Sequence, residues 1–164
     1  MKVNGKSTQT IWLSEDKQNV QIIDQTKLPF EFKVVTLNSF EDAFKAIKNM
    51  LVRGAPLIGV TGAYGVFLAA KENKELKFIE DACDYLNSAR PTAVNLSWAL
   101  NRMLQKAFDS KPNNIIENLC NEANKILEED INFCENIGKY GCEIIKDLYN
   151  KKKRPINILT HCNA

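Results

Sequence analysis

The chain has 164 residues, of which 45% are hydrophobic and 26% are charged, a composition that supports one compact core. Its 22 basic and 20 acidic residues leave a net charge of +2, and no apolar run reaches the length of a membrane span, so we expect neither a nucleic acid nor a membrane as partner. Five cysteines without a C-x-x-C pair and a single histidine give no zinc-ligand spacing, so we expect no metal. The odd number of scattered cysteines favours reduced thiols in a cytoplasmic protein, and we expect no cofactor.

Three runs with strand character precede the helical part of the chain: QTIWLS, VQIID and FKVVTL. Their polar and proline-containing connections predict a small antiparallel meander. From Ser39 the apolar period becomes helical, and Asp42 is placed to complete a capping arrangement. Four helices are expected over about 39–51, 56–71, 75–88 and 92–108, and residues 113–150 are expected as two more with a break between them. Gly138 or Gly141 is expected to be either a kink or a close packing contact.

After Arg154 the run PINILTHC is rich in β-branched and apolar residues, which predicts a buried strand without a sequence-adjacent partner. The expected fold class is α+β. Residues 1–154 are expected to form a small antiparallel β-meander followed by a helical bundle, and residues 155–164 the first strand of a truncated Rossmann-like α/β domain. Because the rest of that sheet is missing, we expect residues 156–164 to be disordered or paired with another chain.

The stretch RGAP places Arg53 before Gly54, Ala55 and a proline that suits the first turn of a helix. A helix N-terminus offers free N–H groups and partial positive charge, and an arginine adds a planar fork suited to phosphate. Alternatively, the arginine is a surface or packing residue, and the glycines that follow at 59, 62 and 65 let helices approach closely.

The same order of residues recurs at Arg90, which stands before Pro91 and Thr92, the expected N-cap of the fourth helix. Two helix starts, each preceded by an arginine, could clamp one phosphate. The alternative for Arg90 is again a surface or packing role.

Cys162 follows the predicted strand, and ligands of open α/β sheets sit outside the carboxyl ends of strands, where a catalytic thiol would be placed. A role as a small apolar filler is equally compatible with this position, and it is our interpretation of the four other cysteines, Cys83, Cys120, Cys134 and Cys142. Strand alternation turns His161 away from Cys162, which favours a structural histidine over a Cys–His pair.

Three motifs together resemble the methylthioribose-1-phosphate isomerases, within the wider family of aldose–ketose isomerases and initiation factor two-B regulatory subunits. They are VRGAPLIGVTGAYGV, ARPTAVNLSWALNRM and LTHCNA, with weaker support from TIWL. Three separate motifs in the family's order make the resemblance specific, and the resemblance extends over nearly the whole chain.

The resemblance implies the N-terminal part of a two-domain enzyme that converts 5-methylthioribose 1-phosphate to 5-methylthioribulose 1-phosphate in methionine salvage, as a homodimer when full length. It implies that Arg53 and Arg90 hold the substrate phosphate, with backbone groups from Gly54 and Ala55, and that Cys162 transfers a proton. The family's second acid, an aspartate, lies beyond residue 164, so we expect the 164-residue chain alone to be inactive.

Two other functions stay open at this point. One is a non-catalytic regulatory subunit of the initiation factor two-B type, against which the thiol of Cys162 argues. The other is isomerisation of a different sugar phosphate, such as ribose 1,5-bisphosphate or 5-deoxyribose 1-phosphate.

Overall fold

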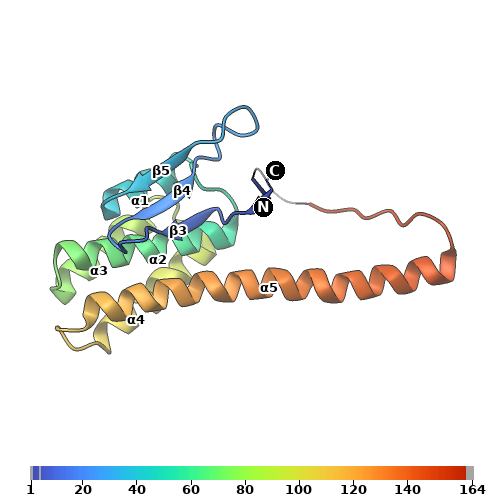
Figure 1. Cartoon of the computed structure of the whole chain (residues 1–164). Helices are drawn as coiled ribbons and strands as arrows, with labels where there is room; N and C mark the ends of the chain where they lie inside the picture. Colours follow the sequence, from blue (N-terminus) through green and yellow to red (C-terminus); the bar gives the residue numbers. More distant parts are fainter. Residues whose placement is uncertain (1, 4, 162–164) are drawn as a thin grey trace. The chain divides into compact units, whose positions relative to one another are not determined.

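The structure is a computed structural model, and it describes residues 2–3 and 5–161. The backbone contacts divide the chain into two compact units, residues 1–126 and residues 127–164. The first unit holds two small sheets, helices α1 to α4 and the beginning of α5 (Figure 1). The second holds the remainder of α5 and the segment that follows it.

The predicted meander is confirmed as a three-stranded antiparallel sheet of β3 (Ile11–Leu13), β4 (Val20–Ile23) and β5 (Val34–Leu37), in that order. Ile22 on the central strand pairs with Ile11 on one side and Val35 on the other. The alternation of apolar residues places one face of the sheet in the core, where Ile11 and Ile22 have no exposed surface. A short hairpin of β1 (Lys2–Val3) and β2 (Lys6–Ser7) precedes the meander.

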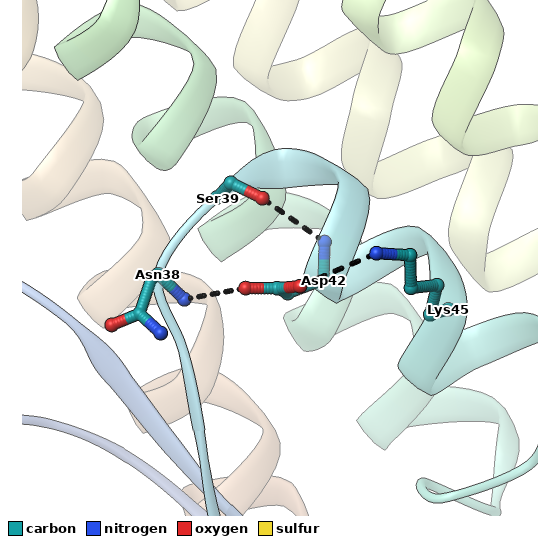
Figure 2. A network of polar contacts seen from close by, with 4 residues as sticks. All are labelled: Asn38, Ser39, Asp42 and Lys45. Atoms are coloured by element: carbon teal, nitrogen blue, oxygen red, sulfur yellow. Dashed lines mark hydrogen bonds and ion pairs between the residues drawn. The ribbon is translucent and has the colours of Figure 1, made fainter.

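Helix α1 (Phe40–Lys48) begins at the capping arrangement expected from the sequence, which is shown in Figure 2. The Ser39 hydroxyl accepts a hydrogen bond from the backbone N–H of Asp42 at 3.3 Å. The Asp42 carboxylate accepts one from the backbone N–H of Asn38 at 3.1 Å and lies 3.7 Å from the Lys45 ammonium. Two otherwise unpaired N–H groups are thereby satisfied, and the direction of the chain from β5 into α1 is fixed.

Helix α2 (Ala55–Glu72) is the centre of the first unit and packs against α1, α3 (Leu76–Asn87) and α4 (Val94–Phe108). Every residue from 58 to 70 is buried, as expected for a helix that is apolar on all sides. A methyl group on Gly59 would lie 2.8 Å from the Asn95 carbonyl oxygen, and one on Gly62 would lie 2.5 Å from Leu96. The glycines of α2 therefore serve helix packing, as the alternative interpretation of the sequence predicted.

The start of α4 differs from the expected one. The N-cap residue is Ala93, which makes no side-chain capping bond, and Thr92 lies in the preceding turn. This turn is closed by a hydrogen bond from the Ala93 N–H to the carbonyl of Arg90 at 3.0 Å, so the helix begins two residues after Thr92.

The prediction of two helices over residues 113–150 is wrong, because α5 (Ile115–Lys152) is a single helix of 38 residues. Glycine inside a helix costs only about 1 kcal/mol relative to alanine, so Gly138 and Gly141 weaken the helix without breaking it. A methyl group on either glycine would meet no atom within 4 Å. None of the described helices combines the length and the hydrophobicity that a membrane span requires.

The strand predicted from residue 156 is absent from the described part of the chain, where residues 155–161 have no regular secondary structure. These residues are exposed, apart from the half-buried Ile156. The physical reason is that a strand forms only where a neighbour accepts its backbone hydrogen bonds, and no described strand pairs with this segment. The α+β class is confirmed for the described residues without a Rossmann-like sheet.

Candidate functional site

Arg53 is held at the start of α2 by the loop that follows β4. Its backbone N–H donates to Gln25 Oε1 at 2.9 Å, and its Nη2 donates to the Gln25 carbonyl oxygen at 2.8 Å. The side chain is half-buried, and it uses one of its five N–H donors in this bond. The remaining donors have no partner among the described residues, so the guanidinium is both oriented and able to bind an anion.

Gly54 is the N-cap residue of α2 and has φ 96° and ψ 133°, in the region that favours glycine. Its carbonyl accepts the N–H of Ile58 at 3.0 Å, which closes the first turn. No side chain caps this helix, and the N–H groups of Ala55 and Leu57 have no acceptor among the described residues. With Ala55 and Pro56 exposed, this helix start is an open set of donors at the positive end of a helix dipole.

Arg90 lies in the turn between α3 and α4 and is half-buried. Its guanidinium makes no hydrogen bond or ion pair with any residue that the structure describes. It stands three residues before the N-cap residue of α4, a helix start that likewise has no side-chain cap. The arrangement is therefore similar to that at Arg53, but without an anchor for the arginine.

The two helix starts lie at the same end of a helix pair. Gly59, in the second turn of α2, faces Asn95 in the first turn of α4, and further along the pair Gly62 faces Leu96 and Leu100. Contacts that advance in the same direction along both helices show that α2 and α4 run parallel. Their partial positive charges add at this end of the first unit, which also carries Arg53 and Arg90.

Cys162 lies outside the described residues, and the neighbouring His161 is exposed. The interpretation of the other cysteines as buried fillers is confirmed for Cys83 and Cys120 and is wrong for Cys134 and Cys142, which are exposed on the second half of α5. Burial raises the pKa of the Cys83 thiol to about 12 and also raises that of Cys120. The higher pKa disfavours the thiolate, the nucleophilic form of cysteine, at both positions.

Among residues 2–3 and 5–161, no group of three or more histidine, cysteine, aspartate or glutamate side chains is placed to hold a metal ion. The residue that the sequence analysis missed is Gln25, the partner of Arg53. No motif marks it, because the two residues are 28 positions apart and meet only through the tertiary fold.

These elements define an α+β protein with two arginine-flanked helix starts side by side. The sequence model of the initiation factor 2 subunit family, IF-2B, matches residues 51–164. The chain belongs to this family.

Similar curated proteins extend well beyond this chain. The whole of this chain aligns with a methylthioribose-1-phosphate isomerase of Rhodospirillum centenum at 47% identity, and with one of Escherichia coli at 46% identity. It spans 44% and 45% of those two proteins, which is less than half.

Two solved structures share the fold. The 5-methylthioribose 1-phosphate isomerase of Pyrococcus horikoshii has a TM-score of 0.78 and 37% identity, over 85% of this chain and 41% of that one. The delta subunit of the translation initiation factor eIF-2B from A. fulgidus has a TM-score of 0.71 and 36% identity, over 76% of this chain and 38% of that one.

Proposed function

We propose that this chain is the N-terminal part of an aldose–ketose isomerase that converts 5-methylthioribose 1-phosphate to 5-methylthioribulose 1-phosphate in methionine salvage. The observation that carries the proposal is the anchored guanidinium of Arg53 beside the uncapped start of α2. The relatives named methylthioribose-1-phosphate isomerase, at 43% to 47% identity over the whole chain, support the choice of substrate.

The substrate phosphate would bind at the paired helix starts. Arg53 would contribute a fork of charged donors, and the backbone at Gly54 and Ala55 would let a phosphate oxygen approach closely, because Gly54 has no side chain and Ala55 is exposed. Arg90 would add a second positive charge from the start of α4. The parallel direction of α2 and α4 supports this assignment, because both helix dipoles favour an anion at the same end.

We further propose that residues 155–164 begin a Rossmann-like α/β domain. Two features support this. Large apolar side chains are exposed on the second half of α5, and Leu159 in the run INIL is 98% exposed. Exposed apolar surface of this kind is typical of a site that another part of a protein covers. The curated relatives are also more than twice as long as this chain.

In that larger protein, Cys162 would act in proton transfer at the sugar. Because C1 is locked as a phosphate ester, the ring has to open without a free aldehyde, so an acid must protonate the ring oxygen. That acid would be an aspartate further along the chain. We propose a homodimer in the cytoplasm for the complete protein, with no nucleic acid and no cofactor.

The test is turnover of 5-methylthioribose 1-phosphate by the polypeptide expressed from the natural reading frame, followed by formation of the ketose phosphate. We expect activity that Arg53→Ala reduces by at least about 100-fold, since it removes charge-assisted bonds to the phosphate. Arg154→Ala is the control, because this arginine is exposed and lies outside the helix starts. The 164-residue chain assayed alone should show no turnover.

Ribose 1,5-bisphosphate and 5-deoxyribose 1-phosphate belong in the same assay. Faster turnover of either would keep the isomerase class and replace the substrate. If none of the three sugars is converted, the isomerase proposal is wrong.

A second candidate function is that of a non-catalytic regulatory subunit of the initiation factor two-B type. The likeness to the eIF-2B delta subunit from A. fulgidus, at 36% identity, favours it. Binding of a phosphorylated ligand without turnover by the natural polypeptide would support this function over the isomerase.

A further inference from the structure

Gln25 connects the β-meander to the segment that carries the RGAP motif through three hydrogen bonds. Its side-chain Oε1 and its carbonyl oxygen accept from the backbone and the guanidinium of Arg53 at 2.9 and 2.8 Å. Its own N–H donates to the carbonyl of Leu51 at 2.9 Å. The turn from Leu51 to Arg53 is therefore fixed by a residue that lies outside the recognised motifs.

Gln25 is itself held in a defined direction by its neighbours. The adjacent Asp24 is buried, and its Oδ1 accepts from the Thr26 N–H at 3.0 Å and from the Thr26 hydroxyl at 2.6 Å. The Asp24 N–H donates to the carbonyl of Lys33 at 2.9 Å. Since both sides of Gln25 are tied down, its carbonyl oxygen offers Arg53 a fixed point of attachment.

We propose that the Gln25 side chain is a positioning group of the phosphate site: by accepting from the Arg53 N–H it holds the backbone that leads into Gly54, and this places the guanidinium against the Gln25 carbonyl. This inference rests on the proposed function, since it assigns a role within the same site. An arginine side chain has many rotamers, and a ligand that must order it loses affinity. The bond to the Gln25 carbonyl orders Arg53 before the anion arrives and leaves its other donors available.

The experiment uses the 164-residue chain labelled with ¹⁵N and inorganic phosphate as the probe. Gln25→Met keeps the length of the side chain and removes the acceptor for the Arg53 N–H. Gln25→Glu restores an acceptor. The matched control is Gln21→Met on β4, which removes a bond of the same kind, since Gln21 Oε1 accepts from Trp12 Nε1 at 2.7 Å.

Two quantities are measured: hydrogen exchange of the Arg53 amide, and the phosphate dissociation constant followed at the amides of Ala55 and Leu57. We expect Gln25→Met to speed the exchange about tenfold and to weaken phosphate binding about tenfold. The reason is that the hydrogen bond from the Arg53 backbone N–H to Gln25 Oε1 is lost. Gln25→Glu should keep the slow exchange. Gln21→Met should change neither quantity by more than about twofold.

Wild-type exchange and wild-type affinity in Gln25→Met would overturn the inference, and so would faster exchange with unchanged affinity, which is the result of a merely structural role. The proposed phosphate site is judged separately by the wild-type chain. If the wild type binds no phosphate at the helix starts, that site and the positioning role both fail. If it binds phosphate and Gln25→Met binds it equally well, only the positioning role fails.

Discussion

Helix α2 is apolar on all sides, whereas the second half of α5 carries its apolar residues among many charged ones. Both contain glycines, three in α2 and two in α5, yet these glycines differ in their surroundings. In α2 a methyl group on Gly62 would overlap with Leu96, whereas one on Gly138 would meet nothing. The buried residues of α5 end at Ile126, and Ile137 is 72% exposed. The comparison teaches that an apolar residue or a glycine contributes to packing only where another element lies against it. Helix α2 has such neighbours around it, and the second half of α5 does not.

The largest expected effect separates a packed leucine from an exposed isoleucine. Leu96 has no exposed surface, so Leu96→Ala should lower the free energy of unfolding by about 3 kcal/mol through lost burial and a cavity against α2. Ile137→Ala on the second half of α5 should change it by less than about 0.5 kcal/mol. Urea denaturation measures both. Equal losses would mean that the second half of α5 is packed as tightly as α2.

Replacing a glycine by alanine should change the free energy of unfolding in opposite directions in the two helices. Gly59→Ala should destabilise the chain by about 1 to 3 kcal/mol, because the new methyl group would lie against the backbone carbonyl of Asn95, which has little room to move. Gly138→Ala should stabilise it by up to about 1 kcal/mol through helix propensity alone. Thermal and urea unfolding of the two variants test this. Stabilisation by Gly59→Ala would contradict the close packing of α2 on α4.

A smaller effect concerns the tie between α2 and the first half of α5. The Tyr64 hydroxyl, on a side chain with no exposed surface, donates to Asn124 Oδ1 at 2.7 Å. Tyr64→Phe should lower the free energy of unfolding by about 1 kcal/mol. Tyr140→Phe is the matched control, because Tyr140 is exposed on the other half of α5 and should show no change. A loss in the control as large as in Tyr64→Phe would contradict the difference between the two halves.

The smallest effect at neutral pH concerns the cysteines. Burial raises the pKa of Cys83 to about 12 from an ordinary value of 9.0, so the fold favours the neutral thiol. The resulting stability is complete below pH 9 and is lost as the pH rises towards 12. Between pH 8 and pH 11 the free energy of unfolding, measured by urea denaturation, should fall more in the wild type than in Cys83→Ala. A disulfide reagent at pH 8 should react with the exposed Cys134 and Cys142 well before Cys83.

Much of the fold follows from the sequence. Alternation over residues 9–37 predicted the meander, and the 3.6-residue period from Ser39 predicted helices whose ends differ by a few residues from those observed. The Ser39 and Asp42 cap was also predictable, because its bonds join residues within one turn. The break in α5 was a wrong prediction, because local glycine signals set a cost of helix formation and do not decide whether the remaining hydrogen bonds outweigh it.

The candidate site divides in the same way. The sequence placed Arg53 and Arg90 before two helix starts, and both starts form, although Ala93 replaces Thr92 as the N-cap residue. The anchor at Gln25 could not be predicted, because its partner is 28 residues distant. The roles of the arginines in phosphate binding and of Cys162 in proton transfer stay predictions.

The sequence by itself determined the periodic elements, the positions of the helix starts and the membership in a family, since each depends on residues a few positions apart or on motif order. Only the tertiary structure decided that α2 and α4 run parallel, that the glycines of α2 face Asn95 and Leu96, and that Gln25 holds Arg53. The physical reason is the separation of the interacting residues along the sequence. Helices and strands are set by backbone hydrogen bonds and by the period of apolar side chains over a few residues, whereas the direction of a guanidinium depends on segments that meet only after the whole unit has packed.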